Sequence, residues 1–167
     1  VPDSAQNVTT EYHNLLVSNE TDLIIKGNVT LPENTKLIIP AGKTLELDDN
    51  SVSAPYGIVN NGTLDIKSGC TNSYEIENNG TLNVGGTVLL LNGKYTSTEN
   101  SVVNVATGQT LTFAESIAIR GLVNGKINVA KQAELSTALG VKVVTSAVID
   151  NYGTVAARGQ MQGFFNA

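Results

Sequence analysis

The chain has 167 residues, of which 15% are charged and 5% aromatic, and its 10 basic and 15 acidic residues give a net charge of −5. The hydrophobic share of 41% can support a core, which excludes the disordered class, and the length suits one domain. The acidic balance argues against nucleic-acid binding, and the apolar runs are too short to cross a bilayer. We therefore expect one domain over residues 1–167, with no nucleic-acid partner and no membrane span.

The N-terminal residues are expected to cap the fold. Thr9 or Thr10 can cap a short helix over residues 11–17, within an N-terminal cap that covers residues 1–20. Such a helix would cover the open end of a stacked repeat. Short extended segments follow, separated by glycine and proline, at residues 23–25, 29–31 and 37–39.

The centre of the chain repeats a unit in which asparagine and glycine precede threonine and an aliphatic residue. The clearest copies are Asn60-Asn61-Gly62-Thr63-Leu64 and Asn78-Asn79-Gly80-Thr81-Leu82. With looser copies included, the marker glycines are Gly42, Gly62, Gly80, Gly108, Gly125 and Gly153. A unit that recurs every 17 to 28 residues is typical of a solenoid, in which each repeat forms one coil. We assign the coils to residues 21–130.

Each unit carries local signals for strands and bends. Leu64-Asp65-Ile66 alternates apolar and polar residues, so one strand face is expected to be buried. The Asn-Gly pairs supply residues that tolerate a left-handed backbone, and asparagine amides would form ladders between coils. Taken alone, Asn-Gly also fits a hairpin turn, so an antiparallel sandwich or barrel is the alternative to a parallel solenoid. The residues assigned to turns and ladders are Asn60, Asn61, Gly62, Asn78, Asn79, Gly80, Asn124, Gly125, Asn151 and Gly153.

The C-terminal part, residues 131–167, is expected to hold an inserted helix, a final coil and a C-terminal cap. The helix is predicted near residues 131–139, where Ala133, Glu134, Leu135 and Ala138 favour helix, and it would end at Gly140.

The segment from Val29 to Leu45, followed by the Asn-Asn-Gly-Thr-Leu repeats, resembles right-handed parallel β-helix domains of bacterial surface and secreted proteins. These include adhesin and autotransporter-type passengers and pectate-lyase-like modules. The resemblance implies an all-β, single-stranded right-handed parallel β-helix. It also implies extracellular or cell-surface display and binding to a glycan or host surface, although fold alone does not establish function.

Candidate chemical groups are sparse. A carbohydrate-active β-helix would need clustered carboxylates, for which Glu46, Asp48, Asp49 and Asp65 are the candidates. Glu46 and Asp65 each follow the marker leucine of adjacent copies, so they are expected to stack on one outward face, where polar residues also serve solubility. The sole histidine, His13, and the sole cysteine, Cys70, give no triad or metal-ligand pattern. No catalytic residue, metal or cofactor is assigned.

Glycan binding would use aromatic faces, and Tyr56 and Tyr74 are separated by 18 residues, which matches the local repeat. We therefore take Tyr56, Tyr74, Glu46 and Asp65 as candidate ligand-binding residues. The favoured hypothesis is a non-catalytic structural or adhesive module of a bacterial surface or secreted protein. The alternatives are a carbohydrate-active β-helix enzyme and a trimeric phage tail-spike fragment.

Overall fold

The computed structural model describes residues 14–16, 23–26, 29–30, 36–48, 52–53, 57–67, 76–86, 88–90, 95–114 and 123–166. Within these residues the secondary structure consists of β-strands and turns, with no helix. Every strand pair is parallel, and each strand pairs with the equivalent strand of the next coil. The protein is therefore an all-β parallel solenoid, as the repeat predicted.

Three parallel sheets form the sides of the solenoid, and each sheet is built from equivalent strands of successive coils. The long sheet contains β2 (Leu23–Lys26), β5 (Thr44–Asp48), β8 (Thr63–Ile66), β10 (Thr81–Val84), β13 (Val102–Val105), β15 (Lys126–Val129), β17 (Lys142–Asn151) and β19 (Gln160–Asn166). The upper sheet contains β1 (Asn14–Leu16), β4 (Lys36–Ile39), β7 (Ile58–Asn60), β9 (Ile76–Asn78) and β12 (Tyr95–Ser97). The lower sheet contains β11 (Val88–Leu90), β14 (Thr110–Phe113), β16 (Glu134–Thr137) and β18 (Thr154–Ala157). A separate two-stranded sheet pairs β3 (Val29–Thr30) with β6 (Val52–Ser53).

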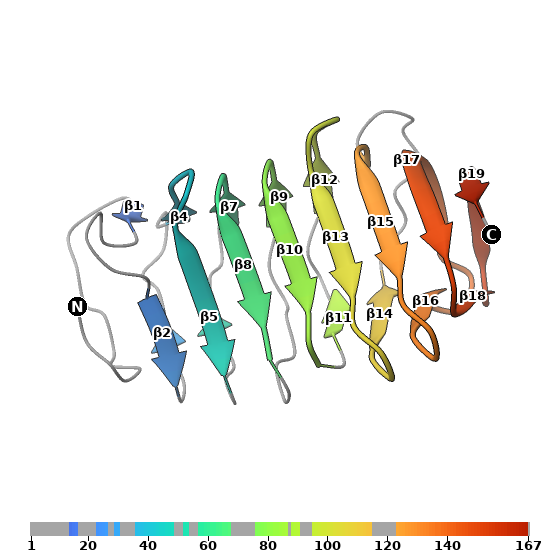
Figure 1. Cartoon of the computed structure of the whole chain (residues 1–167), viewed down its shortest axis with the longest axis horizontal. Helices are drawn as coiled ribbons and strands as arrows, with labels where there is room; N and C mark the ends of the chain where they lie inside the picture. The colour runs from blue at the N-terminus through green and yellow to red at the C-terminus, as the bar shows by residue number, and fades with distance from the viewer. Residues whose placement is uncertain are drawn as a thin grey trace.

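The stack grows along one axis from the N-terminus to the C-terminus. In Figure 1 the long-sheet strands run downward in front, the chain returns upward behind them, and successive coils advance to the right, which is a right-handed winding. Each complete coil passes from the upper sheet to the long sheet and then to the lower sheet. The long sheet is thus a continuous wall along the axis.

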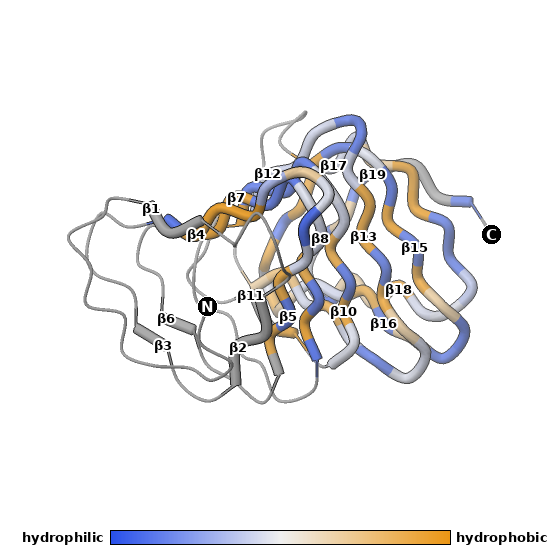
Figure 2. Tube along the Cα trace, turned by 60° about the vertical axis from the view of Figure 1, so that its left-hand side comes forward, coloured by the Kyte–Doolittle hydropathy of each residue, from blue (hydrophilic) through white to orange (hydrophobic). Residues whose placement is uncertain are grey.

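The core lies inside the coil because most of the strands alternate buried and solvent-facing residues. Leu64 pairs in register with Leu45 of the preceding coil and Leu82 of the following coil, and all three are fully buried. Leu111 and Leu135 of the lower sheet stack in the same way. Figure 2 shows the hydrophobic segments along the strands, while hydrophilic segments concentrate at the turns. Fully burying one such side chain contributes about 1.5–3 kcal/mol to folding.

The helix predicted near residues 131–139 is not formed. Residues 130–133 make a turn closed by the Ala133 N–H on the Ala130 carbonyl at 3.0 Å, and β16 follows. Ala133 and Leu135 belong to the hydrophobic core, and Ser136 and Thr137 are also buried, so three of the four residues of β16 are enclosed. The neighbouring coils supply β-pairing partners on both sides of β16, and this pairing overrides helix propensity. In the helix predicted over residues 11–17, residues 14–16 form strand β1, and the rest lies outside the described residues.

The marker glycines do not all occupy the same corner. Gly62, Gly80 and Gly125 precede strands of the long sheet, whereas Gly108 and Gly153 precede β14 and β18 of the lower sheet. In the coil that contains β13 the marker Gly108 precedes β14, and Ser101 stands directly before β13 in place of a marker glycine. The distances between marker glycines are irregular partly because some markers precede long-sheet strands and others precede lower-sheet strands. The same local turn sequence can occur before a strand of either sheet.

The last described coil differs from the others. β17 runs through ten residues without a break and pairs with β19, with a shift of register between Val144 and Val148. Thr145, which lies at this shift, is buried and donates its hydroxyl to the Val123 carbonyl at 3.1 Å. Residues assigned to a C-terminal cap thus extend the long sheet as β19.

Candidate functional site

A buried polar ladder lies at the corner between the upper and long sheets. Asn60 Nδ2 donates to Asn78 Oδ1 at 2.8 Å, and Asn78 Nδ2 donates to the Tyr95 hydroxyl at 3.2 Å. Asn60 and Asn78 are fully buried and Tyr95 is 2% exposed. We call Asn60, Asn78 and Tyr95 the buried ladder. It sits in the core, so these groups are positioned to hold coils together rather than to meet a ligand.

Burial changes the acidity of the tyrosine in this ladder. Removal from water raises the pKa of Tyr95 to about 12, although hydrogen bonds with Asn78 and Ser97 oppose that shift. The Tyr95 ring also packs edge-on against Phe113, with ring centroids 5.8 Å apart. Tyr95 therefore remains a neutral phenol at physiological pH.

The glycines after these asparagines are required by close approach between coils. A Cβ on Gly62 would lie 2.2 Å from the Lys43 carbonyl oxygen, and one on Gly80 would lie 2.2 Å from the Gly62 carbonyl oxygen. Neither glycine adopts the left-handed backbone predicted for the Asn-Gly bends. Gly125 does adopt it, with φ of +81°, and a Cβ there would also meet the Ser101 carbonyl oxygen.

The other predicted ladder residues take different places. Asn79 Nδ2 donates to Asn61 Oδ1 at 3.0 Å on the exposed side of the corner. Asn124 Nδ2 donates to the Ser97 carbonyl at 3.2 Å, and Asn151 Oδ1 accepts the Gly153 N–H at 3.1 Å. Asn151 lies at the corner between the long and lower sheets, so it does not continue the buried ladder.

A second polar ladder follows the outer face of the long sheet. Glu46 and Asp65 lie in register on adjacent strands, as their positions after the marker leucines predicted. Asn83 donates to Asp65 Oδ1, Asn104 donates to Asn83 Oδ1 at 2.8 Å, and Asn128 donates to Asn104 Oδ1 at 2.7 Å. We call Asp65, Asn83, Asn104 and Asn128 the face ladder. Sequence reasoning missed its three asparagines, although each also follows the buried aliphatic residue of its strand.

Charged residues at the two ends of the face ladder are paired. Glu46 Oε2 lies 3.7 Å from Lys67 Nζ, and Asp150 Oδ2 lies 2.6 Å from Lys126 Nζ. Asp150 Oδ1 also accepts a hydrogen bond from Asn166 Nδ2 at 3.1 Å. The hydrogen bonds from Lys126 and Asn166 lower the pKa of the Asp150 carboxyl, which is the wrong direction for a general acid.

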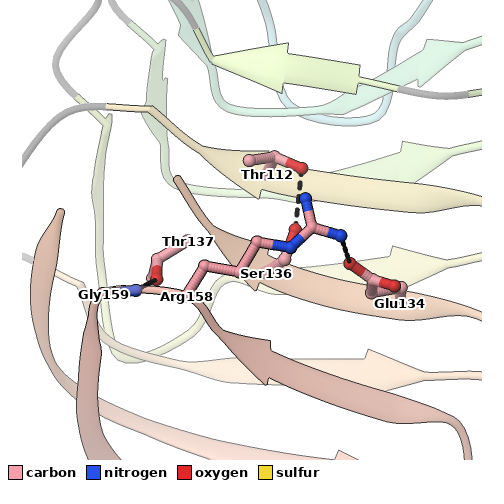
Figure 3. A network of polar contacts seen from close by, with 6 residues as sticks. All are labelled: Thr112, Glu134, Ser136, Thr137, Arg158 and Gly159. Carbon is pink, nitrogen blue, oxygen red and sulfur yellow. Dashed lines mark hydrogen bonds and ion pairs between the residues drawn. The ribbon is translucent and has the colours of Figure 1, made fainter. Parts of the chain in front are cut away.

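The lower sheet carries a smaller polar network (Figure 3). The hydroxyl oxygens of Thr112 and Ser136 lie 2.8 Å apart, and the Gly159 N–H donates to Thr137 Oγ1 at 3.0 Å. The Arg158 side chain extends across Ser136 toward Glu134, with Nη2 3.5 Å from Glu134 Oε1. These contacts link successive coils of the lower sheet.

Several predicted candidates lie outside what the structure describes. These are Asp49, Tyr56, Tyr74, His13 and Cys70, while Asp48 is described only as the last residue of β5. Within the described ranges, no three His, Cys, Asp and Glu side chains gather to hold a metal ion. No helix suited to crossing a bilayer is found in the part of the chain that the structure describes.

Comparisons with known proteins add no assignment: no protein family, no curated protein and no solved structure matches this chain.

Proposed function

We propose that the protein is a non-catalytic structural or adhesive module of a bacterial surface or secreted protein, displayed outside the cell. The observation that carries this proposal is that the acidic side chains Glu46, Asp65 and Asp150 on the long sheet are engaged in contacts with neighbouring side chains. Glu46 and Asp150 form ion pairs, and Asp65 accepts a hydrogen bond from Asn83. Carboxylates engaged in this way stabilise the stack of coils and are poorly suited to acid–base chemistry.

The rod-like architecture supports the same role. A solenoid whose coils contact only their neighbours extends along one axis, and its polar outer wall can carry a binding surface at a distance from an attachment point. The buried ladder and the stacked aliphatic side chains stiffen that rod from inside. A module of this kind needs no cofactor.

The enzyme alternative rests on one observation, the register of Glu46 and Asp65 on adjacent strands. Neighbouring strands lie about 4.8 Å apart, which is close to the carboxyl separation of about 5–5.5 Å in retaining glycosidases. The ion pair of Glu46 with Lys67 weighs against this alternative, because it engages one of the two carboxylates with a neighbouring side chain of the same sheet.

The test incubates the purified protein with a panel of polysaccharides and measures both retention on the polymer and release of new reducing ends. We expect retention on at least one polymer without new ends. New reducing ends that disappear in both Glu46→Ala and Asp65→Ala would overturn the non-catalytic proposal. Asp150→Ala is the matched control, because it removes an outward carboxylate of the same sheet away from that pair.

A further inference from the structure

We propose that the outer face of the long sheet binds an extended, uncharged β-1,4-linked hexose polymer that lies along the face ladder, parallel to the solenoid axis. This inference rests on the proposed function, because it names the ligand of an adhesive module. It depends on four features of the face: its free hydrogen-bonding groups, their spacing, their charge and their accessibility.

The face ladder leaves regular hydrogen-bonding groups for a ligand. An asparagine amide has two N–H groups and two lone pairs on its oxygen. Each of Asn83 and Asn104 donates once to the preceding coil and accepts once from the following coil. One N–H and one lone pair of each amide therefore remain for a partner, and both side chains are only partly buried. Sugar hydroxyls can donate to and accept from such a pair.

The spacing of the ladder suits a polymer. Equivalent atoms on neighbouring parallel strands lie about 4.8 Å apart, and the ladder crosses the strands, so its amides repeat once per coil along the axis (Figure 1). An extended β-1,4-linked hexose chain advances by a slightly longer distance per sugar and turns alternate sugars over. Over the three asparagine rungs one sugar therefore lies beside each coil, and the same hydroxyl edge returns at every second coil. A helical α-linked chain cannot keep successive sugars in register with a straight ladder.

The charge of the face favours an uncharged polymer. The rungs Asn83, Asn104 and Asn128 carry no charge, and the neighbouring cations Lys67 and Lys126 are already paired with carboxylates. A polyuronate would require free cations, and its carboxylates would face Asp65 and Asp150. Neutral sugars avoid that repulsion.

The residues that directly follow β10, β13 and β15 have small side chains, so they leave space beside the face ladder. Gly85 and Ala106 are exposed and Ala130 is half-buried, and each donates its N–H to the preceding coil. In the next coil the equivalent position holds Tyr152, whose N–H bonds to the Val129 carbonyl at 2.9 Å and whose side chain is 72% exposed. Small side chains therefore admit a chain beside the amides, and an aromatic face stands at the C-terminal end of the row, where it can stack on a sugar.

The test measures retention of the protein on insoluble cellulose and chitin, with amylose and polygalacturonate as comparison polymers. We expect binding to cellulose or chitin and at least tenfold weaker binding to the comparison polymers. Ala106→Arg should weaken binding at least tenfold because it fills the open side, and Tyr152→Ala should weaken it about tenfold. Ala41→Arg is the matched control, because Ala41 is also exposed in a tight turn but lies at another corner. It should bind as the wild type does.

The thermal midpoint of each variant shows whether it is folded before binding is compared. Retention of Ala106→Arg equal to that of Ala41→Arg would overturn the inference while leaving an adhesive role on another face. Equal binding to amylose and cellulose, or no binding to either β-1,4-linked polymer, would also overturn it. Cleavage of a bound polymer, in contrast, would contradict the proposed function itself.

Discussion

The corner between the upper and long sheets and the outer face of the long sheet both stack asparagines coil on coil, but in different environments. Asn60 and Asn78 are fully buried at the corner, whereas Asn83 and Asn104 on the face are partly exposed. A lost hydrogen bond at the corner leaves a polar group without water, while on the face water can replace the partner. The same side chain therefore specifies the fold in one region and offers a surface in the other.

The largest expected effect tests the close packing of the corner. Gly80→Ala should lower the free energy of unfolding by about 3 kcal/mol, the upper end of the usual overpacking cost, because the new Cβ would meet backbone atoms. Gly108→Ala is the control: its backbone is left-handed with φ of +75° but the space around it is open, so the loss should be about 1 kcal/mol. Urea unfolding measures both. Equal losses would contradict the importance of close approach.

A pair of leucine substitutions compares the two ladders directly. Asn78→Leu should cost about 2–3 kcal/mol, because it removes the amide that donates to the Tyr95 hydroxyl and leaves one Asn60 N–H without a partner inside the core. Asn104→Leu removes the corresponding interactions on the face and should cost less than about 1 kcal/mol, since water replaces them. The comparison fails if the two variants have the same unfolding midpoint in urea.

Alkaline pH probes the buried ladder through the Tyr95 phenol. The folded pKa of Tyr95 is about 12, above its ordinary value of 10.0, so its contribution is complete below about pH 10 and is lost as pH rises toward 12. The expected loss over that interval is about 2 kcal/mol. Tyr95→Phe has no phenol to ionise, so its stability should fall less over the same range. Urea unfolding at about pH 9 and about pH 12 tests the difference, and parallel losses in both proteins would refute it.

Gln132 tests whether the stability of the corner between the long and lower sheets depends on backbone conformation alone. Its φ of +64° places a non-glycine residue where equivalent turns have Gly108 and Gly140. Gln132→Gly should therefore raise the free energy of unfolding by about 1 kcal/mol, because glycine removes the strain of a left-handed backbone. Gln109→Gly, in the turn before β14, is the control and should give no gain. A lower thermal midpoint for Gln132→Gly would contradict this account.

The smallest effect concerns the ion pair at the end of the face ladder. The folded pKa of Asp150 lies below its ordinary value of 3.8, so its stabilising contribution is present above that pH and is lost as pH falls through the folded pKa. Thermal midpoints of the wild type and Asp150→Asn should therefore converge slightly on acidification below about pH 4. Added salt should reduce the difference at neutral pH, because exposed pairs are screened. A salt-independent difference would argue against an ion-pair contribution.

Much of the fold could be predicted because its signals are local. Alternation in Leu64-Asp65-Ile66 predicts a strand with one buried face, and the recurring Asn-Gly units predict a stack of coils. The register of Glu46 with Asp65 followed from the same repeat. Asn104 was missed because Ser101 instead of a marker glycine precedes its strand, so β13 was not recognised as a copy of the repeat.

The strands that flank the Asn-Gly units, their buried faces and the presence of tight turns could be predicted from the sequence, because these features depend on residues a few positions apart. The sequence did not predict β16, whose strand conformation depends on pairing with the neighbouring coils. The corner that each turn occupies, the burial of particular asparagines and the need for glycine at positions 62 and 80 became visible in the folded structure. Those properties arise from contacts between coils, such as Asn60 with Asn78 over 18 residues and Asn104 with Asn128 over 24 residues. Identical local motifs therefore acquire different roles from the coil on which they stack.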